Sequence, residues 1–373
     1  MGELFEVLTS KKRFDANKVQ VFQDGKNPYV VRTSSNNGQR GFIVEDESYL
    51  NEGNTISFGQ DTATMFYQEK PYFTGDKIKV LKAKNKKFNK NNAQFFISTM
   101  AKAFSTFSWG SSSFNVNIIE NQKLTLPTQN GKIDFAFMEQ FIAELEAERI
   151  AELEAYLKVT GLSDYILTEE ERAVLEAFRS GKISWGGVKL PNGQEVTNIE
   201  WKMFRIGELF EINSYKKRFD ANKVQIEEVG FPYVVRTALN NGIRGYINED
   251  EEFLNEGNTI SFGQDTATMF YQEKPYFTGD KIKIVKCKDE SFNKLNAQFF
   301  ITAMGKAFSS FSWGSSSFSV EIIKNQNISL PSTQGIPLYA YMEVFIRAVQ
   351  KLVIKDVVQY ADRKLEATRA VVK

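Results

Sequence analysis

The sequence contains no histidine among its 373 residues and only one cysteine, Cys287. Without histidine the chain cannot form a Ser-His-Asp or Cys-His nucleophile, a histidine general base, or a histidine-ligated zinc or iron site. A single cysteine excludes a disulfide framework and a cysteine metal site. We therefore expect no cofactor, no metal and no catalytic role, although chemistry based on carboxylates alone stays open.

Long apolar runs are also absent. No stretch approaches the roughly 18 apolar residues of a membrane-spanning helix. The first residues, MGELFEVLTSKKRF, lack the order of charged, apolar and small residues that marks a signal peptide. Together with the single cysteine, these absences predict a cytoplasmic protein without a membrane partner.

Strong charge of one sign is missing as well, because the net charge of the chain is +1. The charge is uneven, with +5 over residues 1–130 and −7 over residues 131–180. If the partner is nucleic acid, binding must rest on local basic patches or on a second, basic subunit.

The sequence does contain a large duplication. Residues 50–79 return without a change as residues 254–283, and the segments KKRFDANKVQ and FSWGSSSF also occur twice. The period of about 204 residues is too long for a solenoid repeat or a propeller blade. A whole domain has therefore been duplicated together with the segment that follows it.

Each repeat has mainly the sequence pattern of β-structure. The runs PYVVRT, NTISFG, ATMFYQ and KIKVLKA are rich in β-branched and aromatic residues, and Asn-Gly or Gly-Asp turns separate them. Residues 91–104 have the apolar spacing of one amphipathic helix. We expect a strand-dominated domain with one or two helices.

The period changes after each repeat. Residues 134–158 are rich in Ala, Glu and Leu and lack Gly and Pro, and a second helical stretch begins at Tyr339. Its apolar residues recur every three or four positions through Met342, Val353 and Tyr360, which predicts a seam for packing on another helix. Each helix is at least ~24 residues, or about 36 Å, so we expect the two to pair antiparallel.

An insert without a counterpart joins the first helix to the second repeat. Thr168 is expected to cap a short acidic helix, with Glu171 completing a capping box and Gly181 ending the helix. The first repeat also lacks the segment IEWKMFRI that leads into the second.

Polar side chains gather at the turns of both repeats, where arginine and asparagine can pair with guanine and adenine edges and basic residues can neutralise phosphates. The candidate DNA-binding residues are Lys11, Lys12, Arg13, Arg32, Ser34, Asn36, Asn37, Gln39, Arg40, Gln60, Asp61, Thr62 and Thr64 in the first repeat, and Lys216, Lys217, Arg218, Arg236, Asn240, Asn241, Arg244, Gln264, Asp265, Thr266 and Thr268 in the second.

Simpler interpretations compete with DNA contact at these positions. Asn37-Gly38 is first of all a hairpin turn, Asp61 can brace its loop, and a basic triplet is usually a solvated face. Two other functions stay open. A duplicated β-rich domain can bind carbohydrate or protein with a helical oligomerisation stalk, and Asp61 with Asp76 can form a paired-carboxylate enzyme site.

A long helix follows the domain that contains the segment GNTISFGQDTATMFYQEKPYFTGDKIKVL. This segment resembles the target-recognition domains of type I restriction–modification specificity subunits and of the related type IIB subunits. The resemblance covers residues 1–158 and 199–373. It implies a non-catalytic subunit that reads two half-sites of a bipartite double-stranded DNA target. It also implies that the helices space the half-sites and dock two methyltransferase subunits, with a restriction nuclease subunit joining the complex.

The expected architecture is α+β, with two similar strand-rich domains separated by two long antiparallel helices that form a coiled-coil stalk with pseudo-two-fold symmetry. Its parts are a first target-recognition domain at 1–130, a spacer helix at 131–160, the insert at 161–198, a second recognition domain at 199–334 and a second spacer helix at 335–373. Because the repeats are nearly identical, we expect half-sites that are nearly the same word in inverted order. They can diverge where Ser34, Ser35 and Gln39 are replaced by Ala238, Leu239 and Ile243.

Overall fold

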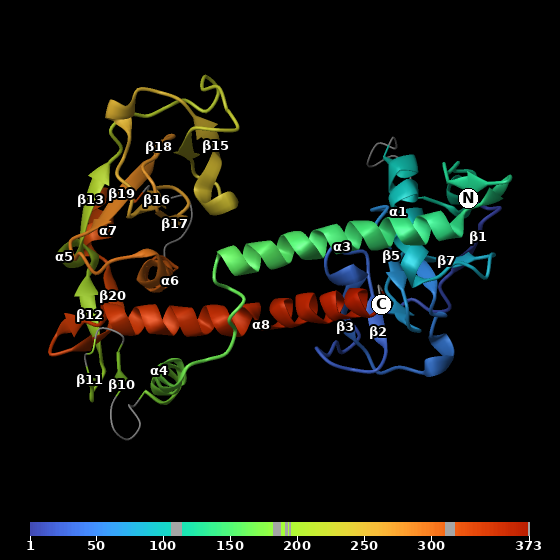
Figure 1. Cartoon of the computed structure of the whole chain (residues 1–373), viewed down its shortest axis with the longest axis horizontal. Helices are drawn as coiled ribbons and strands as arrows, with labels where there is room; N and C mark the ends of the chain where they lie inside the picture. Colours follow the sequence, from blue (N-terminus) through green and yellow to red (C-terminus); the bar gives the residue numbers. More distant parts are fainter. Residues whose placement is uncertain (106–113, 182–187, 191–192, 194, 310–317, 372–373) are drawn as a thin grey trace. The chain divides into compact units, whose positions relative to one another are not determined.

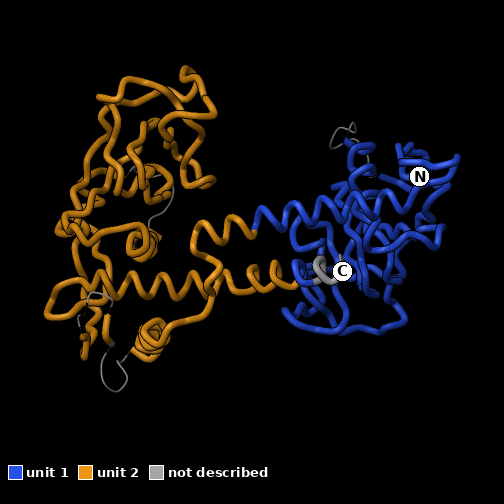
Figure 2. Tube along the Cα trace, viewed as in Figure 1, with its two compact units in different colours: residues 1–153, 364–373 blue, residues 154–363 orange. Residues whose placement is uncertain are grey.

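The structure is a computed structural model that describes residues 1–105, 114–181, 188–190, 193, 195–309 and 318–371. Most of each FSWGSSSF segment lies outside these described residues. The chain divides into two compact units, coloured separately in Figure 2. Unit 1 comprises residues 1–153 and 364–373, and unit 2 comprises residues 154–363.

The described part of unit 1 contains a four-stranded sheet, a three-stranded sheet (Figure 1) and a short two-stranded sheet within residues 128–133. The first has the strand order β1–β7–β4–β5 and is antiparallel throughout, whereas the second has the order β3–β2–β6 with β2 parallel to β6. The predicted strand runs are confirmed as β2, β4, β5 and β7. The bounds are Phe5–Thr9 for β1, Pro28–Val30 for β2, Gln39–Phe42 for β3, Thr55–Gly59 for β4, Met65–Gln68 for β5, Phe73–Thr74 for β6 and Ile78–Ala83 for β7.

Aromatic side chains fill the core of unit 1. Phe5, Phe88 and Phe96 meet edge to face, with ring centroids 5.5–5.6 Å apart. Such pairs contribute about 0.5–1.5 kcal/mol each beyond the burial of their surface. The duplication repeats this arrangement around Phe210 in unit 2.

The helix α1, Lys90–Phe104, confirms the amphipathic helix predicted for residues 91–104. Asn89 and Asn92 form a capping box at its start, which satisfies backbone N–H groups that have no partner inside the helix. Unit 1 continues with α2 (Val116–Glu120), β8 (Thr128–Gln129), β9 (Lys132–Ile133) and α3 (Phe135–Val159).

Unit 2 repeats both sheets, with the orders β13–β19–β16–β17 and β15–β14–β18. The repeated elements are β13 (Phe210–Ser214), β14 (Phe231–Val234), β15 (Ile243–Ile247), β16 (Thr259–Gly263), β17 (Met269–Gln272), β18 (Phe277–Thr278), β19 (Ile282–Cys287), α6 (Lys294–Phe308), α7 (Val320–Asn325), β20 (Asn327–Thr333), β21 (Ile336–Pro337) and α8 (Tyr339–Val371).

Unit 2 also contains elements that have no counterpart in the described part of unit 1. These are α4 (Glu169–Ser180), β10 (Val188–Lys189), β11 (Glu195–Val196), β12 (Glu200–Arg205) and α5 (Ile206–Leu209). The prediction for α4 is confirmed, because Thr168 and Glu171 form the capping box and Gly181 ends the helix in the left-handed conformation at φ 66°.

Both long helices are confirmed, and each contributes residues to both units. Within unit 1, Lys364 Nζ of α8 donates to Glu146 Oε2 of α3 at 3.0 Å, so the two helices pack together there. The predicted apolar seam of α8 is wrong in part. Met342 is fully buried, but Val353 is 72% exposed. The reason is that the first turns of α8 are covered by the core of unit 2 and by α4, so burial follows those neighbours and not one continuous seam.

Candidate nucleic-acid interface

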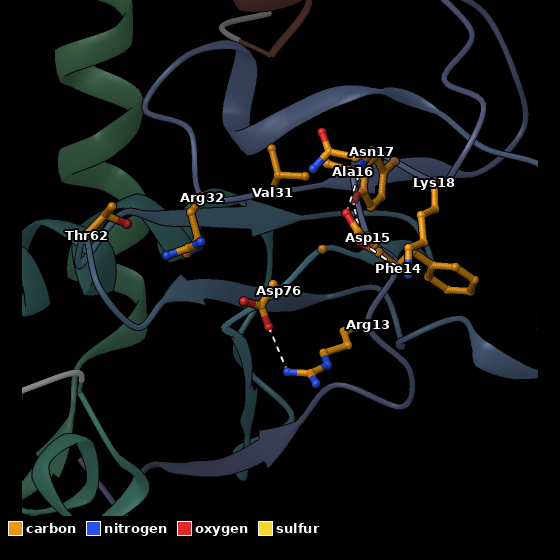
Figure 3. A pocket seen from close by; sticks show the side chains of 12 residues that line it. Arg13, Phe14, Asp15, Ala16, Asn17, Lys18, Val31, Arg32, Thr62 and Asp76 are labelled. Atoms are coloured by element: carbon orange, nitrogen blue, oxygen red, sulfur yellow. Dashed lines mark hydrogen bonds and ion pairs between the residues drawn. The ribbon is translucent and has the colours of Figure 1, made fainter.

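A polar cleft with a volume of about 750 Å³ opens in unit 1 beside the KKRF segment. Figure 3 shows the side chains that line it, with Arg13 and Asp76 pointing toward each other. Its charged and polar lining residues are Arg13, Asp15, Asn17, Lys18, Arg32, Thr62 and Asp76. The equivalent cleft of unit 2, about 400 Å³, is lined by Arg218, Asp220, Arg236, Thr266 and Asp280 among others.

The parallel pairing of β2 with β6 brings these residues together. Val30 lies beside Thr74, so Arg32 and Asp76, two residues further along each strand, leave the sheet at the same end. Arg13 lies close to both residues because its backbone forms a parallel β-bridge with Thr74. The sequence separation of more than sixty residues between Arg13 and Asp76 hides this proximity.

A buried tyrosine fixes the KKRF segment to the sheet. Tyr29 is fully buried, and its hydroxyl donates to the carbonyl oxygen of Phe14 at 2.7 Å. Burial raises the pKa of Tyr29 above its ordinary value, and the nearby Arg40 opposes the shift only in part. The hydroxyl therefore remains a proton donor at neutral pH. Tyr233 holds Phe219 in the same way in unit 2, also at 2.7 Å.

Two carboxylates hold the basic side chains of the cleft. Asp61 accepts from Arg32 and, at 2.8 Å, from Lys77, while Asp76 accepts from Arg13 at 3.0 Å. The side chain of Arg32 is only 33% exposed, so its planar guanidinium is held in one place at the rim of the cleft. A guanidinium has five N–H donors, and one ion pair leaves others for a partner.

Unit 2 keeps the same ion pairs with a small change. Asp265 accepts from Arg236 and from Lys281 at 2.9 Å. Asp280 lies 3.6 Å from Arg218 and 3.9 Å from Arg236, so Arg236 lies between two carboxylates.

Several predicted DNA-binding side chains make hydrogen bonds within their own loops. Asn36 donates to the carbonyl oxygen of Gln39, Asn37 to that of Tyr67 and Gln60 to that of Phe114, all within 3.1 Å. The hydroxyls of Thr62 and Thr64 bond to each other at 2.8 Å. The same bonds recur in unit 2 at Asn240, Asn241, Gln264, Thr266 and Thr268.

The remaining candidates lie toward solvent. Lys11 donates to the carbonyl oxygen of Ser48 at 3.4 Å, and Lys12 lies over the rings of Phe14 and Tyr49 at 4.8 and 4.4 Å. In unit 2, Lys216 donates to the carbonyl oxygen of Glu252 at 3.3 Å, and Lys217 lies over the rings of Phe219 and Phe253. Ser34, Arg40 and Arg244 are exposed, and Gln39 is half-buried.

Sequence reasoning missed Asp15, Asn17 and Lys18 as lining residues and Lys77 as the second partner of Asp61. All four residues lie in segments that are identical in both repeats, and this identity could have indicated them. Asp76 was considered only as an enzymatic carboxylate. Since Asp61 and Asp76 are both paired with cations, neither is a free general base, and the geometry does not favour a paired-carboxylate enzyme.

Over the described ranges, no group of three or more His, Cys, Asp or Glu side chains is arranged to hold a metal ion. The same ranges contain no helix with the length and hydropathy that crossing a bilayer requires.

The repeated cleft and the α+β repeats define a duplicated recognition protein, and comparison with known families identifies the class. The family described as "Type I restriction modification DNA specificity domain" matches this chain over residues 1–155 and 198–351. The chain belongs to this family. It is a DNA specificity subunit of a restriction–modification system, a non-catalytic component of such enzymes. This assignment replaces the carbohydrate- or protein-binding alternative.

Individual relatives agree with the family. The chain is 24% identical over 362 residues to the "Type II restriction enzyme BgcI specificity subunit S.BcgI" of Heyndrickxia coagulans, covering 95% of this chain and 94% of the relative. Its fold is similar to that of the type I restriction–modification system S subunit from M. genitalium. That comparison gives a TM-score of 0.57 at 15% identity and covers 99% of this chain and 92% of the other.

Proposed function

We propose that each repeat reads one half-site of a bipartite DNA target through its polar cleft. The observation that supports this proposal is the recurrence of one set of ion-paired arginines, Arg13 and Arg32 in unit 1 and Arg218 and Arg236 in unit 2.

The exposure of each arginine side chain and its ion pairs suggest which part of the DNA it contacts. Arg32 and Arg236, held by carboxylates and with side chains 33% exposed, are assigned to base edges, where a fixed guanidinium fork pairs with guanine. Arg13 is 76% exposed and, with the neighbouring lysines, is assigned to phosphates. The bonded amide and threonine side chains hold the recognition loops in shape and contribute contacts through their remaining polar atoms.

The rest of the chain is assigned to assembly. Residues 1–130 and 199–334 are the two readers, residues 131–160 and 335–373 are the spacer helices, and residues 161–198 connect them. The readers are related by a pseudo-two-fold axis in this proposal, so their half-sites are inverted. The helices dock two methyltransferase subunits, and a nuclease subunit completes the complex. The family membership and the restriction-enzyme relative support this assignment.

The test is to express the chain with its methyltransferase in cells and to sequence the methylated sites. We expect two nearly identical words in inverted order at a fixed separation. Two unrelated words would contradict the symmetric reading. Binding of the purified complex to duplex DNA should also weaken steeply as salt rises, because phosphate contacts release counterions.

A further inference from the structure

Three phenylalanines form an exposed aromatic face on unit 1. Phe137 and Phe141 on α3 stack with ring centroids 6.2 Å apart, and Phe95 on α1 lies 6.5 and 5.7 Å from them. Phe137 is 49% exposed and Phe141 is 46% exposed. Exposed aromatic clusters of this kind mark interaction surfaces more often than isolated apolar residues do.

The corresponding face of unit 2 is covered by the chain itself. Phe299, the counterpart of Phe95, is 7% exposed because Trp201 of β12 stacks on it with centroids 6.2 Å apart. Phe345, the counterpart of Phe141, lies against Phe178 of α4 at 4.4 Å. In unit 2 this face therefore packs against aromatic side chains, those of Trp201 and Phe178.

An open backbone edge lies in the same unit. In unit 2, β12 pairs along β20 from Glu200↔Ser332 to Arg205↔Asn327. Residues 123–129 are the counterpart of β20, and Leu124 and Leu126 still pack against the core. Within the described part of the chain, the N–H groups of residues 123–126 donate to no backbone carbonyl. Unpaired edges of this kind accept an added strand.

The equivalent carbonyl groups of Gln122 and Gln326 lie at one end of this edge in the two units. In unit 2 the N–H of Ile206, directly after β12, donates to the carbonyl oxygen of Gln326. In unit 1 the ammonium group of Met1 donates to the equivalent carbonyl, that of Gln122. In unit 1, no other described segment lies beside residues 123–127 in the way that β12 lies beside β20. The strand β12 itself already pairs with β20 in unit 2.

We propose that this face of unit 1 docks an extended segment of a partner protein, which adds as an edge strand and places an aromatic side chain on Phe95. A strand fits better than a helix like α4, because Leu338 and Val344, which pack on α4 in unit 2, are replaced by Asp134 and Gln140 in unit 1. The segment has a net positive charge, since α3 has six glutamates against one arginine and one lysine, and β12 has Lys202 and Arg205 against Glu200.

The first test uses the peptide NIEWKMFRI, residues 198–206, as a labelled probe added to the full chain. We expect saturable binding, slower amide hydrogen exchange at residues 123–127, and no change at residues 327–331, which β12 already protects. Phe137→Asp with Phe141→Asp should weaken binding at least tenfold, as should replacing the peptide's tryptophan by serine. Tyr156→Asp, at a residue 59% exposed on the same helix, is the matched control and should leave binding unchanged.

The second test compares amide exchange in the chain alone and in the complex assembled with the methyltransferase. Protection of residues 123–127 only in the complex, lost with the double Phe variant, supports docking of a partner. Protection in the concentrated chain alone would mean that a second copy fills the edge and would overturn the proposal. Fast exchange in every sample would overturn it too. Because the peptide experiment contains no DNA, its failure is distinguishable from failure of the proposed function.

Discussion

Arg32 is positioned before any DNA is present, because its guanidinium pairs with Asp61, which Lys77 also holds. A side chain that is already ordered loses less conformational entropy on binding than a free arginine. The side chain of Arg13, by contrast, is 76% exposed, against 33% for that of Arg32. The two arginines should therefore behave differently when they are removed.

We predict that Arg32→Ala weakens specific binding about 10- to 100-fold, in line with the ~1–3 kcal/mol of a bidentate base contact. Methylation mapping should show one half-site relaxed and the other unchanged, because Arg236 is intact. Arg13→Ala is the control in the same cleft. It should weaken binding to all sequences and lower the salt slope by about 1. If Arg13→Ala relaxed one half-site and Arg32→Ala weakened binding to all sequences, the two assignments would have to be exchanged.

Asn37 illustrates a structural role at a predicted contact position. Its backbone is left-handed at φ 54°, and its side chain donates to the carbonyl oxygen of Tyr67 at 3.0 Å. Asn37→Ala should lower the free energy of unfolding by about 1–3 kcal/mol, since alanine tolerates this conformation poorly and the hydrogen bond is lost. Urea unfolding measures the effect. The exposed Ser34→Ala serves as control and should leave the midpoint unchanged.

At the scale of elements, the insert is attached to α8 through a charged group. Lys351 has a side chain only 11% exposed, and it contacts Asp164 at 2.9 Å and the buried Glu171 at 3.2 Å. Burial by itself lowers the pKa of Lys351, but the hydrogen bonds to Asp164 and Glu171 outweigh it and raise the pKa above 10.5. The ion pair thus links α4 to α8.

We predict that Glu171→Gln lowers the free energy of unfolding by about 1–3 kcal/mol near neutral pH, because a buried cation loses one partner. Because folding raises the pKa of Lys351, its ion pairs stabilise the folded state fully below pH 10.5. This contribution is lost as the pH rises through the folded-state pKa of Lys351. The difference between the wild type and the variant should therefore shrink above pH 10.5. Denaturation at pH 7 and pH 11 measures it, and a constant difference would count against the ion pair.

The sequence predicted best what local chemistry determines. The capping box of Thr168 and Glu171 and the strand runs depend on neighbours a few residues away, so their patterns can be read directly. The cleft was predicted only in part, because its ion pairs join Arg13 to Asp76 and Arg32 to Asp61, residues that lie far apart in the sequence. Composition does not reveal that the Asn and Gln side chains turn inward to backbone carbonyls.

At the scale of the whole molecule, the long helices are the only elements that contribute to both units among the described residues. Removing four residues from the middle of both α3 and α8 shortens each by about 6 Å, or roughly two base pairs at ~3.4 Å per step. We predict a methylated target with the same words and a gap shorter by about two base pairs. Replacing the same four residues by alanine keeps the length and should keep the gap. An unaltered gap in the shortened protein would show that the helices do not set the spacing.

The identical block has a further consequence for how the gene can change. Residues 50–79 and 254–283 fold into the same strands, β4 to β6 and β16 to β18, with the same neighbours. A genetic crossover anywhere within it joins two halves without a mismatched residue at the junction. Such a junction keeps the pairing of β4 with β5 and of β16 with β17, while the segments on either side of the block are exchanged. Under the proposed function, the exchange combines the candidate DNA contacts of one repeat with those of the other.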